Sequence, residues 1–328
     1  FRGRVDITAD YFYNRREDIL IQRVTIPTAT GFRVNPWQNF GVTTNEGFDA
    51  SITVKHNIGK DWVLSARGNV TYAVNKIVEK DEIPQAYPWL AQTGTSIGTN
   101  KIYVAEGLFT NQDFIITEKS DGSYNYKLKD GIATYAADVK PGDIKYKDQN
   151  GDGIIDAEDE IAIGRSNYPE LVYGLNLNAE WKGFDITFFF QGAALADFYY
   201  NGYLAFPYIE GRGGALLEHH IGNTWTPENP KAEFPRLYYG GNANNQLFSS
   251  FWMRNGSYLR LKNVEIGYDF KKLLLSKVSE IQGLRLYFSG SNLLTWSQIK
   301  YFDPELRSTD GSAYPQMKTF VFGANITF

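Results

Sequence analysis

The sequence has no cysteine, only 3 histidines and only 2 methionines among its 328 residues. Without cysteine, the chain can form neither disulfide bonds nor thiolate metal sites. No apolar run approaches the ~18 residues of a transmembrane helix. The net charge of −4 gives no basic surface of the kind that binds nucleic acid, so we predict no nucleic-acid partner.

Signatures of enzymes are also missing. The sequence contains no G-x-S-x-G segment, no phosphate-binding loop and no H-E-x-x-H segment. His219 and His220 are adjacent, so they cannot form the i, i+4 pair that one helical face presents to a metal, and a loop pair is the favoured interpretation. Because no nucleophile and base stand out, we predict that the protein is not an enzyme, and a barrel-shaped hydrolase is a disfavoured hypothesis.

Aromatic residues, by contrast, are abundant. They make up 16% of the chain, which is high for a soluble enzyme and typical of a membrane β-barrel with aromatic girdles. The last fifteen residues, YPQMKTFVFGANITF, show the expected alternation. From Phe320 to Phe328, every second residue is apolar and most of the others are small or polar, which predicts a strand with one apolar face. A transmembrane β-strand needs about 9–11 residues, and this segment is long enough.

The same alternation recurs along the chain and predicts about eight long strands. They are joined alternately by short turns, near Gly59 and Gly183, and by long loops. A Gly-, Pro- and Asn-containing loop covers about 25–44, and the two longest loops cover 76–167 and 201–250. Short periplasmic turns and long extracellular loops are typical of outer-membrane barrels, so we predict an all-β, antiparallel transmembrane β-barrel surrounded by outer-membrane lipid. One strand changes parity after Leu261, and either a bulge near Asn263 or the edge of the apolar band would reconcile its two halves.

The whole chain, 1–328, is predicted to be one β-barrel domain. Eight strands could close into a small barrel filled by side chains. Alternatively, they are part of a larger ring, which suits loops of this length better. The chain opens at Phe1 without an initiator methionine or a signal peptide, so we expect a mature piece or a C-terminal fragment of a partial barrel.

One motif has the spacing of a metal site. The segment DQNGDGIIDAED, residues 148–159, places hard oxygen donors at positions 1, 3, 5, 7, 9 and 12 of a calcium loop, with Gly153 at position 6 where the chain turns sharply. The predicted ligands are Asp148, Asn150, Asp152, the Ile154 carbonyl, Asp156 and Asp159. Position 12 is Asp, not the bidentate Glu of a sensor EF-hand, so we predict a structural Ca²⁺ that stiffens an exposed loop. The alternative is an Asx-rich turn without metal.

Candidate substrate contacts are less specific. Trp37, Trp89 and Trp225 could stack on sugar rings, or could equally pack inside their own loops. Charged residues predicted to face the lumen could shape a pore or hold a plug, although a generic hydrated interior is the favoured interpretation. They are Asp6, Asp10, Arg67, Glu180, Asp185, Glu265 and Arg285.

Several segments together resemble the SusC/RagA family of TonB-dependent outer-membrane transporters. They are Gly142–Asn176, Asn223–Leu237, Ser257–Phe270, Leu284–Trp296 and Tyr314–Phe328. The resemblance implies a 22-stranded barrel with an N-terminal plug, a TonB box and often a SusD-like surface lipoprotein as lid. It also implies import of oligosaccharides or peptides. Only the C-terminal barrel region of the family is matched, and neither plug nor TonB box is recognisable here.

Two functions therefore remain open from the sequence. The first is a part of a TonB-dependent outer-membrane importer, supplying pore wall and extracellular mouth. The second is a secreted, calcium-stapled β-sandwich that binds glycans without transport. The two differ in whether the apolar strand faces meet lipid or a second sheet.

Overall fold

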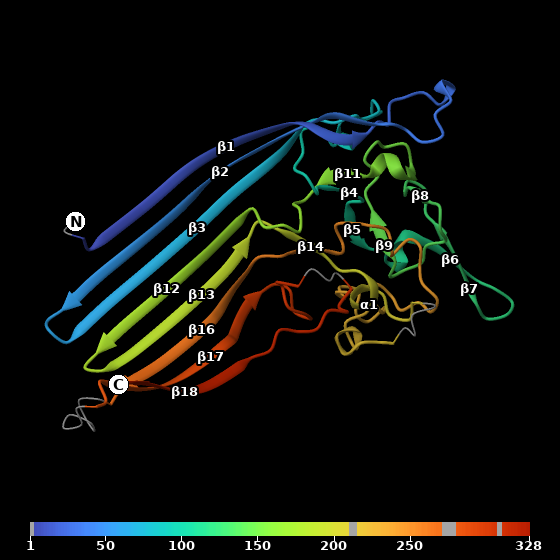
Figure 1. Cartoon of the computed structure of the whole chain (residues 1–328). Helices are drawn as coiled ribbons and strands as arrows, with labels where there is room; N and C mark the ends of the chain where they lie inside the picture. Colours follow the sequence, from blue (N-terminus) through green and yellow to red (C-terminus); the bar gives the residue numbers. More distant parts are fainter. Residues whose placement is uncertain (1–2, 210–214, 271–279, 307–309) are drawn as a thin grey trace.

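The structure is a computed structural model that describes residues 3–209, 215–270, 280–306 and 310–328 (Figure 1). Its main element is one sheet of eight strands in the order β1-β2-β3-β12-β13-β16-β17-β18, and every neighbouring pair is antiparallel. The strands are β1 Val5–Gln22, β2 Trp37–Ile58, β3 Trp62–Glu79, β12 Leu171–Trp181, β13 Phe184–Ala194, β16 Tyr258–Asp269, β17 Gly283–Ser297 and β18 Thr319–Thr327. The predicted antiparallel barrel strands are confirmed, and the sheet is open between β1 and β18.

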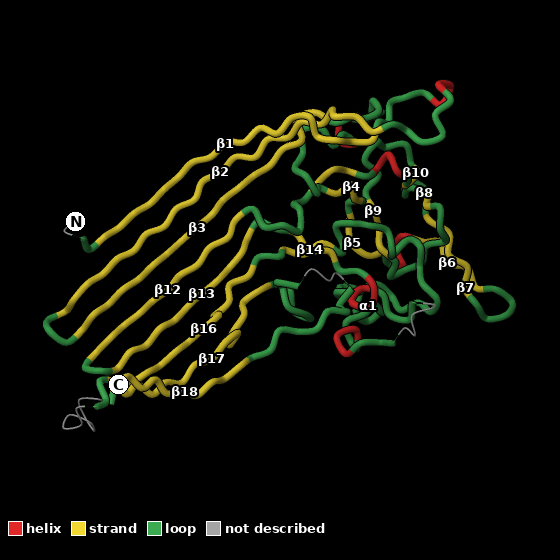
Figure 2. The backbone as a smooth tube through the Cα atoms, in the orientation of Figure 1, coloured by secondary structure: helices red, strands yellow, loops and turns green. Residues whose placement is uncertain are grey.

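The sheet is a single layer, with its short turns at one end and the long loops gathered at the other (Figure 2). β1 begins and β18 ends at the turn end (Figure 1). Nothing in the described part of the chain covers one face of the sheet: Phe320 and Phe322 on β18 are 62% and 86% exposed, although both are large and apolar. An exposed apolar face on every strand is what a lipid-facing wall requires.

The height of this apolar face can be measured along one strand. On β3 the outward-facing Trp62 and Tyr72 lie ten positions apart. At about 3.3 Å per residue and a tilt of about 40°, this spacing spans roughly 25 Å, the height of the apolar band of outer-membrane barrels. At the turn end, Trp62 stacks on Trp181 with ring centroids 5.5 Å apart, and Phe184 contacts Tyr268 at 4.3 Å. These neighbouring rings form the aromatic girdle that the composition predicts.

Two departures from simple alternation have physical causes. The predicted bulge is confirmed, because the pairing of β16 with both neighbours shifts between Leu261 and Asn263. Lys262 is the extra residue against β13, whereas against β17 the extra residue lies on β17, where Asn292 and Leu293 oppose Lys262. The predicted loop 25–44 is wrong in its second half, because β2 already begins at Trp37. β1, β2 and β3 have 18, 22 and 18 residues against 11 in β12 and β13, so the first three strands continue beyond the band that lipid covers.

The loops at the far end pack together into one unit, here called the loop body, made of the described residues of 80–170, 195–257 and 298–318. Its buried core combines Tyr103, Ile144, Tyr146 and Ile155 from the first loop, Phe198, Tyr200, Ala205, Phe234 and Trp252 from the second, and Ile299 from the third. Because all three loops contribute to one core, each is held by the others.

Short elements complete the loop body. The strands are β4 Asn100–Ile102, β5 Ala105–Leu108, β6 Phe114–Glu118, β7 Tyr124–Leu128, β8 Thr134–Tyr135, β9 Ile144–Tyr146, β10 Ile154–Ile155, β11 Ile161–Ile163, β14 Asp197–Tyr199 and β15 Met253–Asn255. The helix α1 covers Gly202–Ala205, and 3-10 turns cover Pro88–Leu90, Asn111–Asp113, Ala157–Asp159 and Glu218–His220, with a further one at Thr28–Thr30 in the β1–β2 loop. Within the described ranges, no helix has the length and apolar character needed to cross a bilayer.

Candidate functional site

The acidic loop 148–159 is folded by bonds from its own backbone to its side chains. The Asp148 carboxylate accepts from the Gly151 and Gly153 amides at 2.7 and 2.8 Å. The fully buried Asp159 carboxylate accepts from the Gln149 and Asp156 amides at 2.7 and 3.0 Å. The loop therefore already has the closed path that a calcium loop needs, with position 12 folded back onto position 2.

The same loop is anchored to the rest of the loop body. Ile155 is buried in the shared core, and the Ile154 and Thr134 backbones pair in the small β10–β8 sheet. The Trp89 indole donates to the Glu158 carbonyl at 2.9 Å. A change in this loop is therefore transmitted to the core and to the segment around Trp89.

The centre of the acidic loop holds an amide group. Asn150 Nδ2 donates to Asp152 Oδ2 at 3.1 Å and to Glu158 Oε2 at 3.2 Å. Among the described residues, no three or more His, Cys, Asp or Glu side chains converge as a metal site. The carboxylate oxygens nevertheless retain lone pairs beyond those used by the backbone amides, and a half-turn of the Asn150 amide would present oxygen in place of nitrogen. These oxygen donors therefore suit a hard cation. Calcium binding by the loop itself stays a prediction.

The three candidate tryptophans are not brought together. Trp37 lies at the start of β2 and is 62% exposed. Trp89 stacks on Tyr87 with ring centroids 4.5 Å apart, in addition to its bond to the acidic loop. Trp225 covers Gly142, where an added Cβ would lie 2.4 Å from its ring. Trp89 and Trp225 therefore make structural contacts, and Trp37 alone is open to a ligand.

A cluster of tyrosines in the second loop was missed from the sequence. Tyr239 is 86% exposed, and its ring lies 6.2 Å from that of Tyr208. Beside Tyr238 a small cleft of about 30 Å³ has an apolar floor that includes Phe206 and Trp252. The Tyr-Tyr-Gly-Gly run at 238–241 was the available signal, because glycines beside exposed rings give a loop room to shape a binding surface. This tyrosine cluster combines exposed flat rings with a small apolar cleft.

A buried aspartate ties the first loop to the second. Asp143 is fully buried, and Arg236 Nε lies 2.8 Å from its Oδ1. Its Oδ1 also accepts from the Asn242 and Asn245 side-chain amides, both at 2.9 Å, and its Oδ2 accepts from the Lys140 amide at 2.8 Å. A buried carboxylate is stable only with this many partners, so the Asp143 cluster fixes the relative position of two loops.

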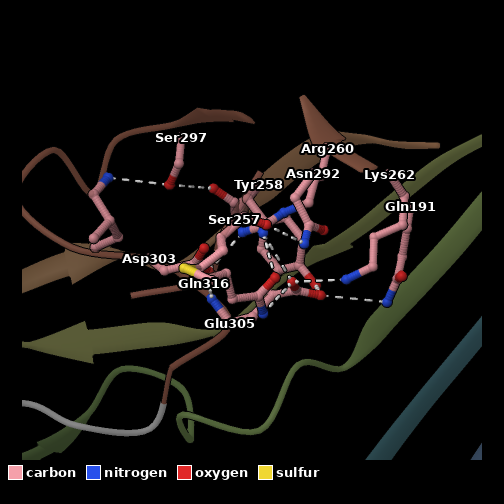
Figure 3. A network of polar contacts seen from close by, with 12 residues as sticks. Gln191, Ser257, Tyr258, Arg260, Lys262, Asn292, Ser297, Asp303, Glu305 and Gln316 are labelled. Atoms are coloured by element: carbon pink, nitrogen blue, oxygen red, sulfur yellow. Dashed lines mark hydrogen bonds and ion pairs between the residues drawn. The ribbon is translucent and has the colours of Figure 1, made fainter. Parts of the chain in front are cut away.

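A second polar cluster ties the third loop to the barrel wall (Figure 3). Arg260 on β16 is 1% exposed, and it donates to Asp303 Oδ1 at 2.5 Å and lies 3.3 Å from Glu305 Oε2. Glu305 also accepts from the Tyr258 hydroxyl at 3.0 Å and from Gln316 at 2.9 Å. The third loop is thus fastened to the inward face of the wall next to the bulge.

Three of the predicted lumen charges meet on the inward face. Arg285 donates to Asp185 Oδ2 at 2.9 Å and to Glu265 Oε1 at 2.6 Å, across β17, β13 and β16. These charges neutralise one another in part, which is the arrangement expected of a hydrated interior.

The two adjacent histidines share one acceptor. Nε2 of His219 and Nε2 of His220 lie 3.0 and 3.1 Å from the Leu204 carbonyl oxygen, at the end of α1. His220 is fully buried, and burial together with the neighbouring His219 lowers the pKa of His220 to about 4. The loop pair predicted from sequence is therefore a buried contact that holds neutral imidazole.

Acidification is expected to loosen this part of the loop body. An unfolded histidine gains its proton near pH ~6.5, while folded His220 stays neutral down to about pH 4. The unfolded state therefore binds more protons in this window, and stability falls as the pH drops through it. Hydrogen exchange of 215–224 at pH 7.5 and 5 would measure the effect. His220→Gln should flatten the pH dependence, while His56→Gln should not; an unchanged slope in His220→Gln would contradict this assignment.

Comparison with known proteins agrees with this architecture. A family model described as TonB dependent receptor-like, beta-barrel matches residues 1–153. TonB-dependent receptor P26 of Formosa agariphila is 29% identical, and the alignment covers all of this chain and 33% of the receptor. TonB-dependent receptor SusC of Bacteroides thetaiotaomicron is 26% identical, and the alignment covers 99% of this chain and 30% of the receptor. The chain thus spans about a third of the length of these curated relatives.

Solved structures give the same result for the fold. The whole chain aligns with the RagAB peptide importer in its closed-closed state, with a TM-score of 0.69 and 22% sequence identity, and it covers 34% of that chain. It also aligns over its whole length with the open-open state, with a TM-score of 0.68 and 24% identity, and covers 33% of that chain. These matches, with the strand pattern and the exposed apolar face, show that the chain has the outer-membrane β-barrel fold of TonB-dependent receptors and is similar in sequence to SusC and other members of that group.

Proposed function

We propose that the chain forms part of the pore wall and of the extracellular mouth of a TonB-dependent importer. The observation that carries the proposal is the combination of one continuous sheet, apolar outside and charged inside, with a co-folded loop body at one end of it. Oligosaccharides and peptides are the proposed substrate classes. A SusD-like surface lipoprotein is the proposed partner at the loop body, and import would be driven through TonB acting on a plug.

The sandwich alternative needs a second sheet over the apolar face. Besides the eight-stranded sheet, the described residues form only two-stranded sheets, and the outward side chains remain exposed. A soluble sandwich would bury them. The structure therefore favours the importer over the secreted glycan-binding protein.

Uptake by whole cells tests the proposed function. Deleting the gene should abolish uptake of the labelled oligosaccharide or peptide, and expressing the protein in a strain without TonB should leave surface binding but no import. Separate glycan and peptide arms assign the substrate class. Import that continues without TonB would overturn the proposal.

The proposed substrate contacts are Trp37 and the tyrosine cluster. Both present exposed rings, and ring stacking serves sugars and peptides alike. Trp89 and Trp225, proposed from sequence as further contacts, are held by bonds and packing within the loop body. Their replacement should reduce folding of the loop body as well as any binding.

We propose in addition that the acidic loop takes a structural Ca²⁺. Asp148, Asn150, Asp152, Asp156, Asp159 and the Ile154 carbonyl would hold it, and its charge would add to the hydrogen bonds that fold the loop and to the burial of Ile155.

Calcium is expected to protect the acidic loop, and Asp152→Ala should remove the effect. Hydrogen exchange of 148–159 with chelator and with calcium would show strong protection in the unchanged protein, because the ion binds only the folded loop. The control is Asp121→Ala, which removes an exposed Asx-turn carboxylate elsewhere in the first loop and should keep the calcium response. Equal protection with and without calcium would leave the metal-free Asx turn as the correct interpretation.

A further inference from the structure

Two glycines flank a tyrosine on the inward face of the sheet. Tyr287 on β17 pairs with Gly267 on β16 at one side and with Gly323 on β18 at the other. A Cβ added at Gly323 would lie 2.2 Å from Cζ of the Tyr287 ring. One added at Gly267 would lie 2.6 Å from Cζ of Arg285, which precedes Tyr287 on the same face. Both large side chains therefore lie flat along the wall, each in the place that a glycine leaves open.

Charged contacts hold the tyrosine ring in this position. The Arg285 guanidinium carbon lies 5.2 Å from the centre of the Tyr287 ring. The same guanidinium donates to Asp185 on β13 at 2.9 Å and to Glu265 on β16 at 2.6 Å. These four side chains and the two glycines are here called the inner clasp. The inner clasp connects β18 to β13 across β16 and β17.

The outward face of β18 does not specify how this strand is aligned with β17. Its outward residues are all apolar, and they are Phe320, Phe322, Ala324 and Ile326. A slip by two residues would keep each of them in lipid, so the apolar pattern fixes only the parity. β18 carries no charged side chain that could form an ion pair with β17. The connection 298–318 is too long to set the register as a tight hairpin turn does.

The inward face of β18 does specify the register. Gly323 is its one inward residue without a Cβ, and the others are Thr319, Val321, Asn325 and Thr327. A slip by two residues would bring Val321 or Asn325 opposite Tyr287. The Tyr287 ring already occupies the place that their Cβ atoms would need, so both slipped alignments displace the ring.

We propose that the inner clasp is a register lock for β18. The other edge of β18 has no partner strand among the described residues, and backbone groups in a bilayer need one. The lock therefore decides which backbone groups β18 offers to a further strand of the barrel, because a slip by two residues moves them by about 7 Å. The proposal rests on the barrel fold and not on what is transported.

The test uses paired cysteines, because this chain has none of its own. Leu286 and Ala324 are directly opposite, so a disulfide between Leu286→Cys and Ala324→Cys reports the observed register. Leu286→Cys combined with Phe322→Cys or with Ile326→Cys reports a slip by two residues in either direction. After oxidation of the protein in outer membranes, we expect the first disulfide to dominate, since diagonal neighbours lie farther apart.

Changes to the inner clasp should alter the ratio of observed to slipped disulfides. Gly323→Val fills the place of the ring and should lower this ratio about tenfold. Tyr287→Ala removes the ring and should also raise the slipped disulfides, whereas Tyr287→Phe keeps the ring and should keep the ratio. Ser289→Val is the matched control, because it enlarges an inward residue of β17 outside the inner clasp and should keep the observed register.

Heat-modifiable migration on a gel identifies folded protein for each variant. If Gly323→Val does not fold, combining it with Tyr287→Ala should restore folding, because the place of the ring is then empty. The proposal is overturned if Tyr287→Ala or folded Gly323→Val keeps the ratio of the unchanged protein, or if the combined variant does not regain folding. An equal fall of the ratio in Ser289→Val would also overturn it, since any change of the inward face would then shift β18.

Discussion

Asp143→Ala is expected to unfold the contact between the first and second loops while the barrel strands stay intact. The Asp143 carboxylate is fully buried. Its removal leaves the Arg236 guanidinium and the Asn242 and Asn245 amides without their shared acceptor. Breaking a buried ion pair by removing one partner costs about 3–5 kcal/mol. Hydrogen exchange should rise sharply in 140–147 and 234–247, with the strands unchanged.

Two control variants separate the effect of losing the Asp143 charge from a general loss of folding. Asp143→Asn keeps the shape and one oxygen acceptor but loses the charge, so its effect should be intermediate. Asp130→Ala removes an exposed aspartate in the same loop and should have little effect. If Asp143→Ala leaves exchange in both segments unchanged, Asp143 does not hold the two loops together.

Leu177→Arg is expected to destabilise the folded barrel by about 2–4 kcal/mol, because it places a charge on the lipid face near the middle of the band. Leu177 lies four positions from Trp181 and six from Leu171 on β12, between two outward-facing neighbours, Ala66 and Phe188. Urea unfolding in lipid vesicles would measure the free energy, and gel migration would give the folded fraction.

The neighbouring position supplies the matched control. Asn178 follows Leu177 and faces inward, between Ser65 and Thr187. Asn178→Arg should therefore change stability by much less, because the inward face is hydrated. Equal losses in both variants would mean that the apolar face does not meet lipid.

The barrel strands could be predicted because lipid imposes a simple rule on them. Each residue faces either hydrocarbon or the interior, so the pattern repeats every two positions, and even the parity change at Lys262 was visible as a bulge near Asn263. This alternation is no longer imposed where the strands leave the lipid. The beginning of β2 at Trp37 was missed because Gly41 and Val42 are buried next to each other, without alternation.

Candidate sites could likewise be predicted from the sequence only where their residues lie close together along the chain. The acidic loop was visible because all its candidate ligands lie within twelve consecutive residues, and calcium spacing is local. The Asp143 cluster was invisible because its side-chain partners lie 93 to 102 positions away. The tyrosine cluster also depends on folding, since Tyr208 and Tyr239 come together only when the second loop closes on itself.

The shared core of the three loops limits how the loop body can move. Pulling one loop aside would expose Trp252, Ile144 or Ile299 to water and break the contacts of the other two loops. Any displacement is therefore expected to move the three loops together as one rigid unit. A substitution that loosens one connection should for the same reason disturb all three.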